Sequence, residues 1–190
     1  MTADPVIIPA IAGDGSLYPM EKMQAHRDGL LHLAVSVFLF DAELLLIQKR
    51  AEGKYHCPGL WANTCCTHPD WGEALDSCAS RRLGQELGLA PLPLRRHATV
   101  EYRAEVGAGM VEHERVTLFS GHVDRHTLRI APAREEVSAL RWVGAAELCG
   151  DMRANPQDYT PWFRIYLERF PDFDFDRLRD HPDQTLLCLA

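Results

Sequence analysis

The sequence predicts one α+β domain, a mixed-sheet sandwich over residues 1–190, and three observations indicate this fold class. The length of 190 residues is that of a single domain able to bury its own core. Apolar residues make up 46% of the chain and charged residues 25%, a balance typical of soluble globular proteins and too hydrophobic for intrinsic disorder. Strand and helix patterns follow one another as strands, helix, strands, helix, without a repeat or a linker between them.

The first third of the chain predicts a hairpin followed by a long loop. Residues 1–20 mix Pro, Gly and Asp without periodicity and are interpreted as an N-terminal extension. Two β-rich runs, Leu30–Phe40 and Glu43–Gln48, are joined at Asp41-Ala42, which predicts a β-hairpin. Residues 49–69 lose this periodicity and gather Gly, Pro, His, Cys and Trp, so we expect a functional loop there.

A helix and a second pair of strands are predicted next. Leu and Ala side chains recur every four residues over Glu73–Leu87, and Gly88 stands where a helix would end. Strand patterns over Thr99–Ala104 and Val111–Val123 flank the turn residues 107–109. This order predicts a helix that packs on a sheet.

The last third predicts one more strand and one more helix. Val137–Val143 has strand composition, and Pro161 takes a favoured first position for a helix over Trp162–Phe170. The C-terminal segment, residues 171–190, carries apolar residues but no pattern that decides between packing over a pocket and packing against a partner.

Charge and composition exclude several classes of partner. The net charge of -7 repels nucleic acid and anionic membrane surfaces, so an anionic ligand needs a local basic pocket. The longest apolar stretch, Leu30–Phe40, is 11 residues and too short to span a bilayer. No basic residue precedes Lys22, so a secretory signal is not expected, and the six cysteines form no C-x-x-C pair. We expect a cytoplasmic protein with reduced thiols.

The segment Glu112-His113-Glu114 places two carboxylates on one face of a predicted strand and the imidazole on the other. Two carboxylates that share a face repel each other unless a cation lies between them. A solvated edge strand is the alternative interpretation, because charged residues usually face water.

Three histidines could complete such a site. His26 and His32 bracket the entry to the first predicted hairpin, and His68 lies in the long loop. Three imidazoles and two carboxylates are a suitable mixed ligand set for Zn²⁺, Mn²⁺ or Mg²⁺. Taken alone, each histidine is more often a surface or satisfied core residue than a ligand, and sequence spacing alone does not bring distant segments together.

Residues Thr67–Leu89 align with the Nudix box, G-x5-E-x7-R-E-U-x-E-E-x-G-U, but depart from its chemistry. Arg82 and Gln85 occupy two positions where that family has glutamates, and only Glu86 remains of the three acidic residues. The helix carboxylates of the family hold the Mg²⁺ that assists diphosphate hydrolysis. A hydrolytic metal cluster is therefore not favoured, and Arg82 with Glu86 could simply form a surface ion pair.

The loop Pro58–Pro69 resembles the W-x-N-x-x-C-x-H-P signature of the type 1 isopentenyl-diphosphate delta-isomerases, a Nudix family. Further matches over Lys22–Trp162 are the paired early histidines, the Y-R-A at Tyr102, the two glutamates and Pro161-Trp162. This resemblance implies a Nudix-type α/β/α sandwich with a mixed sheet. It also implies interconversion of isopentenyl and dimethylallyl diphosphate, a small-molecule prenyl diphosphate substrate, in isoprenoid biosynthesis.

The resemblance further implies a ligand set. One divalent ion, Mn, Mg or Zn, would be held by His26, His32, His68, Glu112 and Glu114. A Mg²⁺ that arrives with the diphosphate would be held by Glu86, with Cys66 also counted among the metal-site residues. The residues expected to bind the substrate are Lys22, Arg50, Lys54 and Arg82 at the phosphates, and Trp162 at the hydrocarbon. Trp61 is interpreted separately as a wall of the pocket, with a core aromatic as the alternative.

By the same resemblance, Cys66 and Glu114 are the proton-transfer pair, with Tyr102 beside the glutamate. The reaction adds a proton at C4 and removes one from C2 through a tertiary carbocation, which the face of Trp162 would stabilise. Because the reaction is reversible, the acid and base roles exchange. Cys65 is expected to be an inert buried residue, since neighbouring side chains alternate in direction.

Two other functions compete with this interpretation. A Nudix pyrophosphohydrolase would use the same scaffold but needs the displaced helix carboxylates. A zinc-stabilised binding module would use Cys57, Cys65, Cys66 and His68, although adjacent cysteines seldom bind one ion together. The sequence leaves the resident ion and the oligomeric state open.

Overall fold

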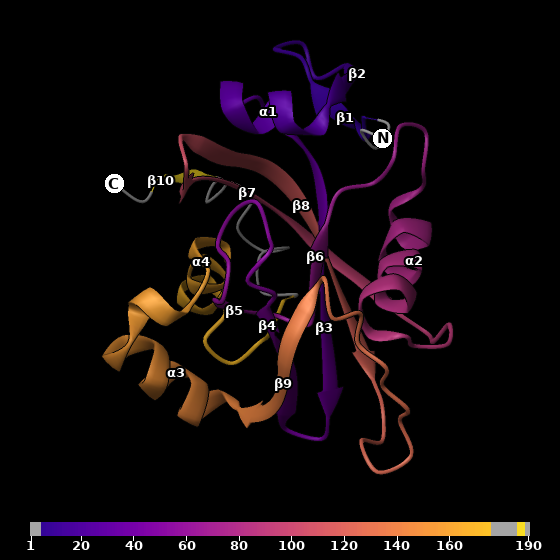
Figure 1. Cartoon of the computed structure of the whole chain (residues 1–190), viewed down its shortest axis with the longest axis vertical. Coiled ribbons are helices and arrows are strands. Elements are labelled where there is room, and N and C mark those ends of the chain that lie inside the picture. Colours follow the sequence, from indigo (N-terminus) through magenta and orange to yellow (C-terminus); the bar gives the residue numbers. More distant parts are fainter. Residues whose placement is uncertain (1–4, 176–185, 189–190) are drawn as a thin grey trace.

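The computed structural model describes residues 5–175 and 186–188, and within them ten strands form one mixed sheet (Figure 1). The main path runs β10, β7, β8, β3, β1, β2; β4 and β6 also pair with β3, and β4 pairs with β5 and β9. The pairs β3 with β8 and β7 with β10 are parallel. The strands are β1 (Ile7–Ile11), β2 (Leu17–Glu21), β3 (His32–Asp41), β4 (Leu44–Arg50), β5 (Trp61–Ala62), β6 (Cys65–Thr67), β7 (Arg95–Gly107), β8 (Met110–His122), β9 (Val137–Gly144) and β10 (Leu186–Cys188).

Helices cover both faces of the sheet, as the α/β/α sandwich requires (Figure 1). They are α1 (Lys22–Asp28), α2 (Leu75–Leu87), α3 (Ala145–Ala154) and α4 (Pro161–Arg169), with a short 3₁₀ turn at Pro156–Asp158. None of the helices in the described ranges is long and apolar enough to cross a membrane.

Alternation along β3 produces two separate cores. Val35 and Val37 point to the core beneath α2, where they pack with Leu83 and neighbouring apolar side chains. Ala34 and Phe38 point to the opposite core, beneath α3 and α4. The period of two in a strand thus builds both layers from one segment.

The predicted hairpin, central helix and later strands are confirmed. The strands β3 and β4 pair antiparallel, β7 and β8 pair around the predicted turn, and Pro161 begins α4. Gly88 ends α2 with a φ of 66° and donates its N–H to the Gly84 carbonyl. A Cβ added at Gly88 would lie 2.6 Å from the Ala131 carbonyl oxygen, so only glycine fits this close approach.

The structure differs from the prediction at the N-terminus and in the long loop. Residues 7–21 form the hairpin β1–β2 instead of an irregular extension, and β1 extends the sheet beside β3. Pro9 faces Pro19 across this hairpin, which hides the strand pattern.

Helix α1 has seven residues and is too short for a periodic signal. Helix α3 is also absent from the prediction, and residues 49–69 contain the short strands β5 and β6.

The C-terminal segment packs in part on the core. Phe175 lies 4.6 Å from Phe38 between ring centroids, and Phe173 lies 6.3 Å from it. Strand β10 pairs with β7 at the edge of the sheet. The remainder of the predicted C-terminal segment, residues 176–185 and 189–190, lies outside the described residues.

Candidate active site

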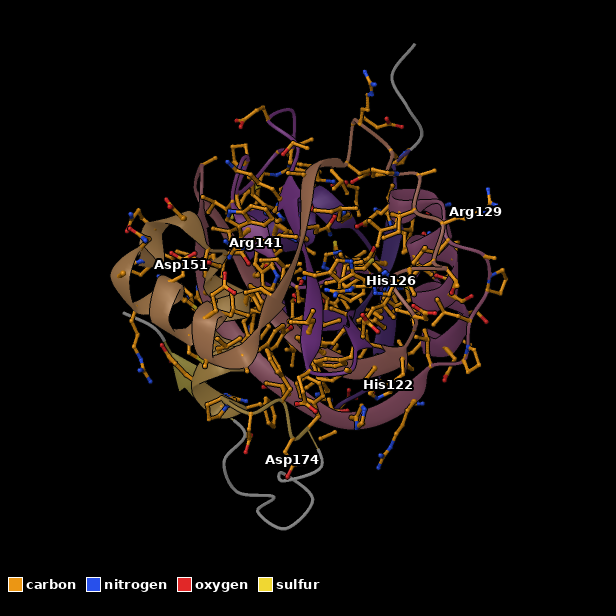
Figure 2. The ribbon with its side chains drawn as sticks, turned by 90° about the horizontal axis from the view of Figure 1, so that it is seen from below. His122, His126, Arg129, Arg141, Asp151 and Asp174 are labelled. Carbon is orange, nitrogen blue, oxygen red and sulfur yellow. The ribbon has the colours of Figure 1, made fainter. Side chains whose placement is uncertain are left out.

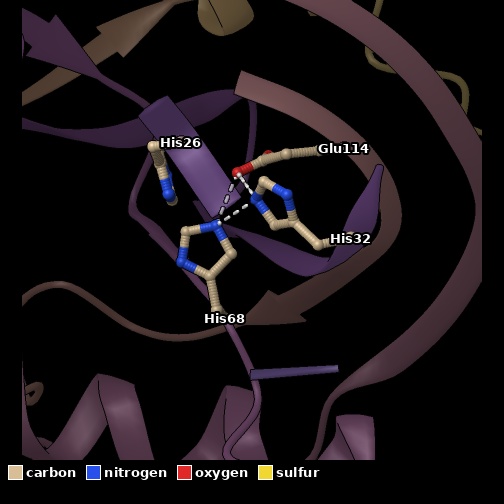
Figure 3. A group of neighbouring side chains, drawn as sticks. All are labelled: His26, His32, His68 and Glu114. Carbon is tan, nitrogen blue, oxygen red and sulfur yellow. Dashed lines mark hydrogen bonds and ion pairs between the residues drawn. The ribbon is translucent and has the colours of Figure 1, made fainter. Parts of the chain in front are cut away.

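Three histidines and one glutamate converge from four different elements (Figure 3). His26 comes from α1, His32 begins β3, His68 follows β6, and Glu114 lies on β8. The parallel pairing of β3 with β8 puts His32 directly opposite Glu114. All four side chains are buried, and their donor atoms lie within 4.8 Å of one another.

The geometry of this cluster fits a divalent ion. The Nε2 atoms of His32 and His68 are 3.1 Å apart, and Nε2 of His68 is 2.7 Å from Oε1 of Glu114. Ligands at right angles around an ion, each at about 2.1 Å, would lie about 3 Å from one another. Nε2 of His26 is buried without a hydrogen-bond partner. This orphaned nitrogen is available for an ion.

Backbone carbonyls fix the tautomers of two of these imidazoles. Nδ1 of His26 lies 2.7 Å from the carbonyl oxygen of Lys22, and Nδ1 of His32 lies 2.7 Å from that of Leu30. A carbonyl can only accept, so each ring carries its proton on Nδ1 and presents the lone pair of Nε2 to the cluster. This is the form in which histidine binds a metal.

The electrostatics of the cluster also suit an ion. Burial, with the neighbouring His32, lowers the pKa of His26 to about 4. Burial likewise lowers the pKa of His68 well below its ordinary value, so both rings are neutral at neutral pH, as ligation requires. Burial acts to raise the pKa of Glu114, but contacts with His32 and His68 outweigh it and lower that pKa well below its usual range.

Glu112 lies in a second, adjoining group with His26 and His56. Its Oε1 is 3.2 Å from Nε2 of His56, and its Oε2 is 3.1 Å from the hydroxyl of Tyr102. Burial, followed by the charge of Glu114, raises the pKa of Glu112 well above its ordinary value. Both glutamates are buried, so the alternative of a solvated edge strand is wrong.

His56 is a site residue that the sequence analysis missed. It is 4% exposed, and burial followed by the charge of Arg50 lowers its pKa to about 2. The only signal for it was its position in the long loop, between Tyr55 and Cys57.

The Cys66 thiol is surrounded by polar groups on the same side of the sheet. Its Sγ donates to Oδ1 of Asn63 at 2.8 Å and lies 3.2 Å from the hydroxyl of Ser36, which contacts the Tyr166 hydroxyl at 2.9 Å. Burial raises the pKa of the thiol well above its ordinary value. Cys65 lies in the core beneath α2 on the opposite face, as alternation predicts.

Four cationic side chains line the cavity that these groups share. They are Lys22, Arg50, Lys54 and Arg82. Burial, followed by the charges of Lys54 and Arg82, lowers the pKa of Lys22 to about 8. Nε of Arg82 is buried without a partner. This local basic surface is the one that the negative net charge requires for an anionic ligand.

Carboxylates hold two of these cations in place. Glu86 contacts Arg82 at 2.5 Å and accepts from the Gln48 amide at 3.0 Å. Glu136, which the sequence analysis did not identify, bridges Lys54 at 2.5 Å and Arg82 at 3.4 Å.

The two predicted tryptophans differ in position. Trp162 is buried, lines the cavity, and leaves its indole N–H without a partner. Trp61 does not line the cavity: its ring packs 5.2 Å from the guanidinium of Arg141, which pairs with Asp151 beside it (Figure 2). The prediction that Trp61 forms a wall of the pocket is therefore corrected.

The remaining predicted ligands lie beside the ion cluster. Cys66 and Glu86 line the cavity but belong to neither group of converging metal donors among the described residues. Cys57, Cys65, Cys66 and His68 do not form such a group there either. The alternative of a zinc-stabilised module therefore has no geometric support in this part of the chain.

Comparisons with known proteins agree with this architecture. The NUDIX domain profile matches residues 30–163. The crystal structure of DR0079 from Deinococcus radiodurans superposes with a TM-score of 0.69 at 12% identity, over 86% of this chain and 98% of that one. A MutT protein from Methanosarcina mazei gives a TM-score of 0.60 at 18% identity, over 78% and 95% of the two chains. At these identities the two structures show a shared fold.

Curated relatives are more similar in sequence. The isopentenyl-diphosphate delta-isomerase of Cereibacter sphaeroides is 50% identical over 92% of this chain and 98% of its own. That of Rhodobacter capsulatus is 50% identical over 85% and 92% of the two chains. That of Ruegeria pomeroyi is 50% identical over 90% and 93%. The chain therefore belongs to the isopentenyl-diphosphate delta-isomerase family of NUDIX-domain proteins.

Proposed function

We propose that the protein interconverts isopentenyl diphosphate and dimethylallyl diphosphate in isoprenoid biosynthesis. One observation carries this proposal: a thiol, Cys66, and a buried carboxylate, Glu114, line the same cavity as four cations. The reaction needs two groups that exchange protons with a hydrocarbon and an anchor for its diphosphate. The family membership supports the same reaction.

The cations anchor the diphosphate. Arg50 and Arg82 present their remaining guanidinium N–H donors to phosphate oxygens, while Lys22 and Lys54 add point charges. The free Nε of Arg82 is one donor that the protein itself leaves unused. A Mg²⁺ that accompanies the diphosphate would be held at Glu86.

A resident Mn²⁺, Mg²⁺ or Zn²⁺ would be held by His26, His32, His68, Glu112 and Glu114. When bound, such an ion stabilises the negative charge that these buried carboxylates carry. The protein holds the imidazoles in the correct tautomer through the carbonyls of Lys22 and Leu30. Tyr102 orients both carboxylates from the neighbouring strand.

Cys66 and Glu114 perform the two proton transfers. In the resting site burial keeps the proton on the Cys66 thiol, whereas the carboxylate of Glu114 is ionised because contacts with His32 and His68 lower its pKa. The two groups therefore rest in opposite protonation states, one with a proton and one without. For the reverse reaction the two groups exchange these states.

The hydrocarbon end of the substrate lies against Trp162, whose face stabilises a tertiary carbocation. Without substrate the cavity has a volume of about 30 Å³, roughly that of one water molecule. Substrate binding therefore requires lining side chains to move.

The working environment follows from charge and composition. We propose that the protein acts as a single catalytic domain in the cytoplasm on a free prenyl diphosphate. The net charge of -7 disfavours nucleic acid as a partner.

Incubation with isopentenyl diphosphate in deuterated water tests the proposal. We expect solvent deuterium in the dimethylallyl product, detected by mass spectrometry, without release of inorganic phosphate. A Nudix pyrophosphohydrolase would release phosphate and leave the double bond in place. That result would replace the isomerase with the hydrolase, even though Arg82 and Gln85 occupy positions of the hydrolytic carboxylates.

A further inference from the structure

His56 is a buried imidazole to which neither the sequence motifs nor the family comparison gives a role. Its Nε2 lies 3.2 Å from Oε1 of Glu112. Its ring stacks on His26 with centroids 5.7 Å apart and meets the edge of Trp162 at the same distance. The side chain is therefore fixed on three sides within the site.

Arg50 determines which nitrogen of His56 carries the proton. Nη2 of Arg50 lies 3.4 Å from Nδ1 of His56. A guanidinium can only donate hydrogen bonds, so Nδ1 must accept and the proton of the neutral ring lies on Nε2. His56 thus has the opposite tautomer to His26 and His32, whose Nδ1 atoms face carbonyls.

Arg50 also fixes the backbone that carries His56. Its Nη2 donates to the carbonyl of His56 at 3.0 Å, and its Nε donates to the carbonyl of Cys57 at 3.2 Å. Cys57 has a φ of 46°, a conformation that a residue with a Cβ adopts only when its surroundings hold it. One guanidinium therefore holds both the ring and the turn beneath it.

With this tautomer the protonated Nε2 of His56 lies beside the Glu112 carboxylate and has no lone pair for a metal. If Nε2 of His56 bound a metal, the ring proton would lie on Nδ1. That N–H would then point at an N–H of Arg50, and the two donors would repel each other. We propose that His56 is a positioning residue which holds the Glu112 carboxylate in place for the isomerase reaction, with Arg50 fixing its orientation. This inference rests on the proposed function, which it deepens.

The consequence is a continuous chain of polar contacts from the diphosphate anchor to the metal site. Arg50 orients His56, Nε2 of His56 lies 3.2 Å from Oε1 of Glu112, and the Tyr102 hydroxyl donates to Oε2. Both oxygens of this carboxylate are then held by the protein. Loss of a partner that orients a metal ligand typically lowers metal affinity or activity by about 10-fold to 100-fold.

Two variants separate positioning from packing. His56→Gln keeps an N–H donor near the place of Nε2, whereas His56→Leu fills a similar volume without a donor. We expect Leu to lower kcat and the affinity for Mn²⁺, measured by equilibrium dialysis, each by about 10-fold to 100-fold. Gln should restore most of both, and KM for the diphosphate should change less than kcat. Equal values for Leu and wild type, or for Gln and Leu, would overturn the inference.

Long-range ¹H–¹⁵N NMR of the histidine-labelled wild type gives an independent test without any variant. We expect His56 to carry its proton on Nε2, both without metal and after Zn²⁺ is added, while His26, His32 and His68 show ligation. A metal-bound Nε2 or a protonated Nδ1 at His56 would contradict the assignment. If the wild type lacks isomerase activity, the proposed function fails, but the Mn²⁺ affinities and this spectrum still decide the role of His56.

Discussion

The hydroxyl oxygen of Tyr102 lies 2.6 Å from Oε2 of Glu114, while Oε1 of the same carboxylate contacts His68 at 2.7 Å. The two residues face each other across the β7–β8 ladder, where they are directly paired. Each oxygen of Glu114 therefore has its own partner, and the carboxylate plane is fixed between the histidines and the phenol.

Tyr102→Phe should lower kcat by about 10-fold to 100-fold, since a hydrogen bond to a charged group contributes about 1.5–3 kcal/mol. Steady-state kinetics measures this loss. Tyr159→Phe is the matched control, because Tyr159 donates to Asp151 at 2.6 Å outside the catalytic cavity. The control should lose some stability and keep its kcat, and equal losses of kcat in both variants would deny Tyr102 a specific role.

Cys66→Ala should abolish isomerisation while the protein still folds, because the thiol lines the cavity and the neighbouring cores remain intact. Cys65→Ala should retain most of the activity, since Cys65 packs in the core on the other face of the sheet. Deuterium incorporation and thermal unfolding of both variants check this pair. If Cys65→Ala lost all isomerase activity and Cys66→Ala kept it, the reacting thiol would be Cys65.

Metal removal should abolish activity and lower the free energy of unfolding. An ion that binds only the folded state stabilises it by about 2.7 kcal/mol at a free concentration 100 times its dissociation constant. Chemical denaturation after chelation, and again after Mn²⁺, Mg²⁺ or Zn²⁺ is restored, measures this difference. Equal midpoints in all samples would exclude an ion at the histidine cluster.

Arg82→Met should raise KM for the diphosphate by about 10-fold to 100-fold, since a charge-assisted donor is lost. It should also destabilise the fold by about 3 kcal/mol, because Glu86 would keep a buried charge without its cation. Arg81→Met is the control: Arg81 pairs with Glu73 at the surface, so we expect unchanged KM and a loss of about 1 kcal/mol or less. A similar KM for both variants would contradict an anchoring role for Arg82.

Substrate affinity should decline as the pH rises through about 8, where Lys22 loses its proton. The anion favours the charged amine, so KM should rise above this pH. The Lys22→Met variant separates this effect from ionisation of the substrate. Both proteins bind the same substrate, so any difference between their profiles of KM against pH arises from Lys22. Parallel profiles for both proteins would show that Lys22 does not contact the substrate.

The lowered pKa of Lys22 also affects the free energy of unfolding. Here the effect is favourable as the pH rises, whereas substrate affinity declines. The unfolded chain titrates Lys22 near its ordinary pKa of 10.5, above the folded value of about 8. Between these values the unfolded state binds more protons, so the contribution of Lys22 to stability increases with pH over this window.

Local patterns in the sequence predicted the central elements and part of the site. Alternation put Glu112 and Glu114 on one face and separated Cys65 from Cys66, because side-chain direction in a strand depends only on the neighbouring residues. Helical spacing and Gly88 predicted α2 for the same local reason. The motif resemblance predicted which polar residues gather, but not how they contact each other.

Only the tertiary structure decided the contacts over long sequence separations. The parallel pairing of β3 with β8 sets His32 against Glu114, and the fold of residues 49–69 brings His56 to Glu112. Trp61 was misplaced for the same reason, since its neighbour Arg141 is distant in the sequence. Hydrogen-bond partners also set the tautomers of the imidazoles. The sequence by itself determined the chemical groups and their local direction, whereas packing between distant segments determined their partners, because such contacts arise only when the sheet assembles.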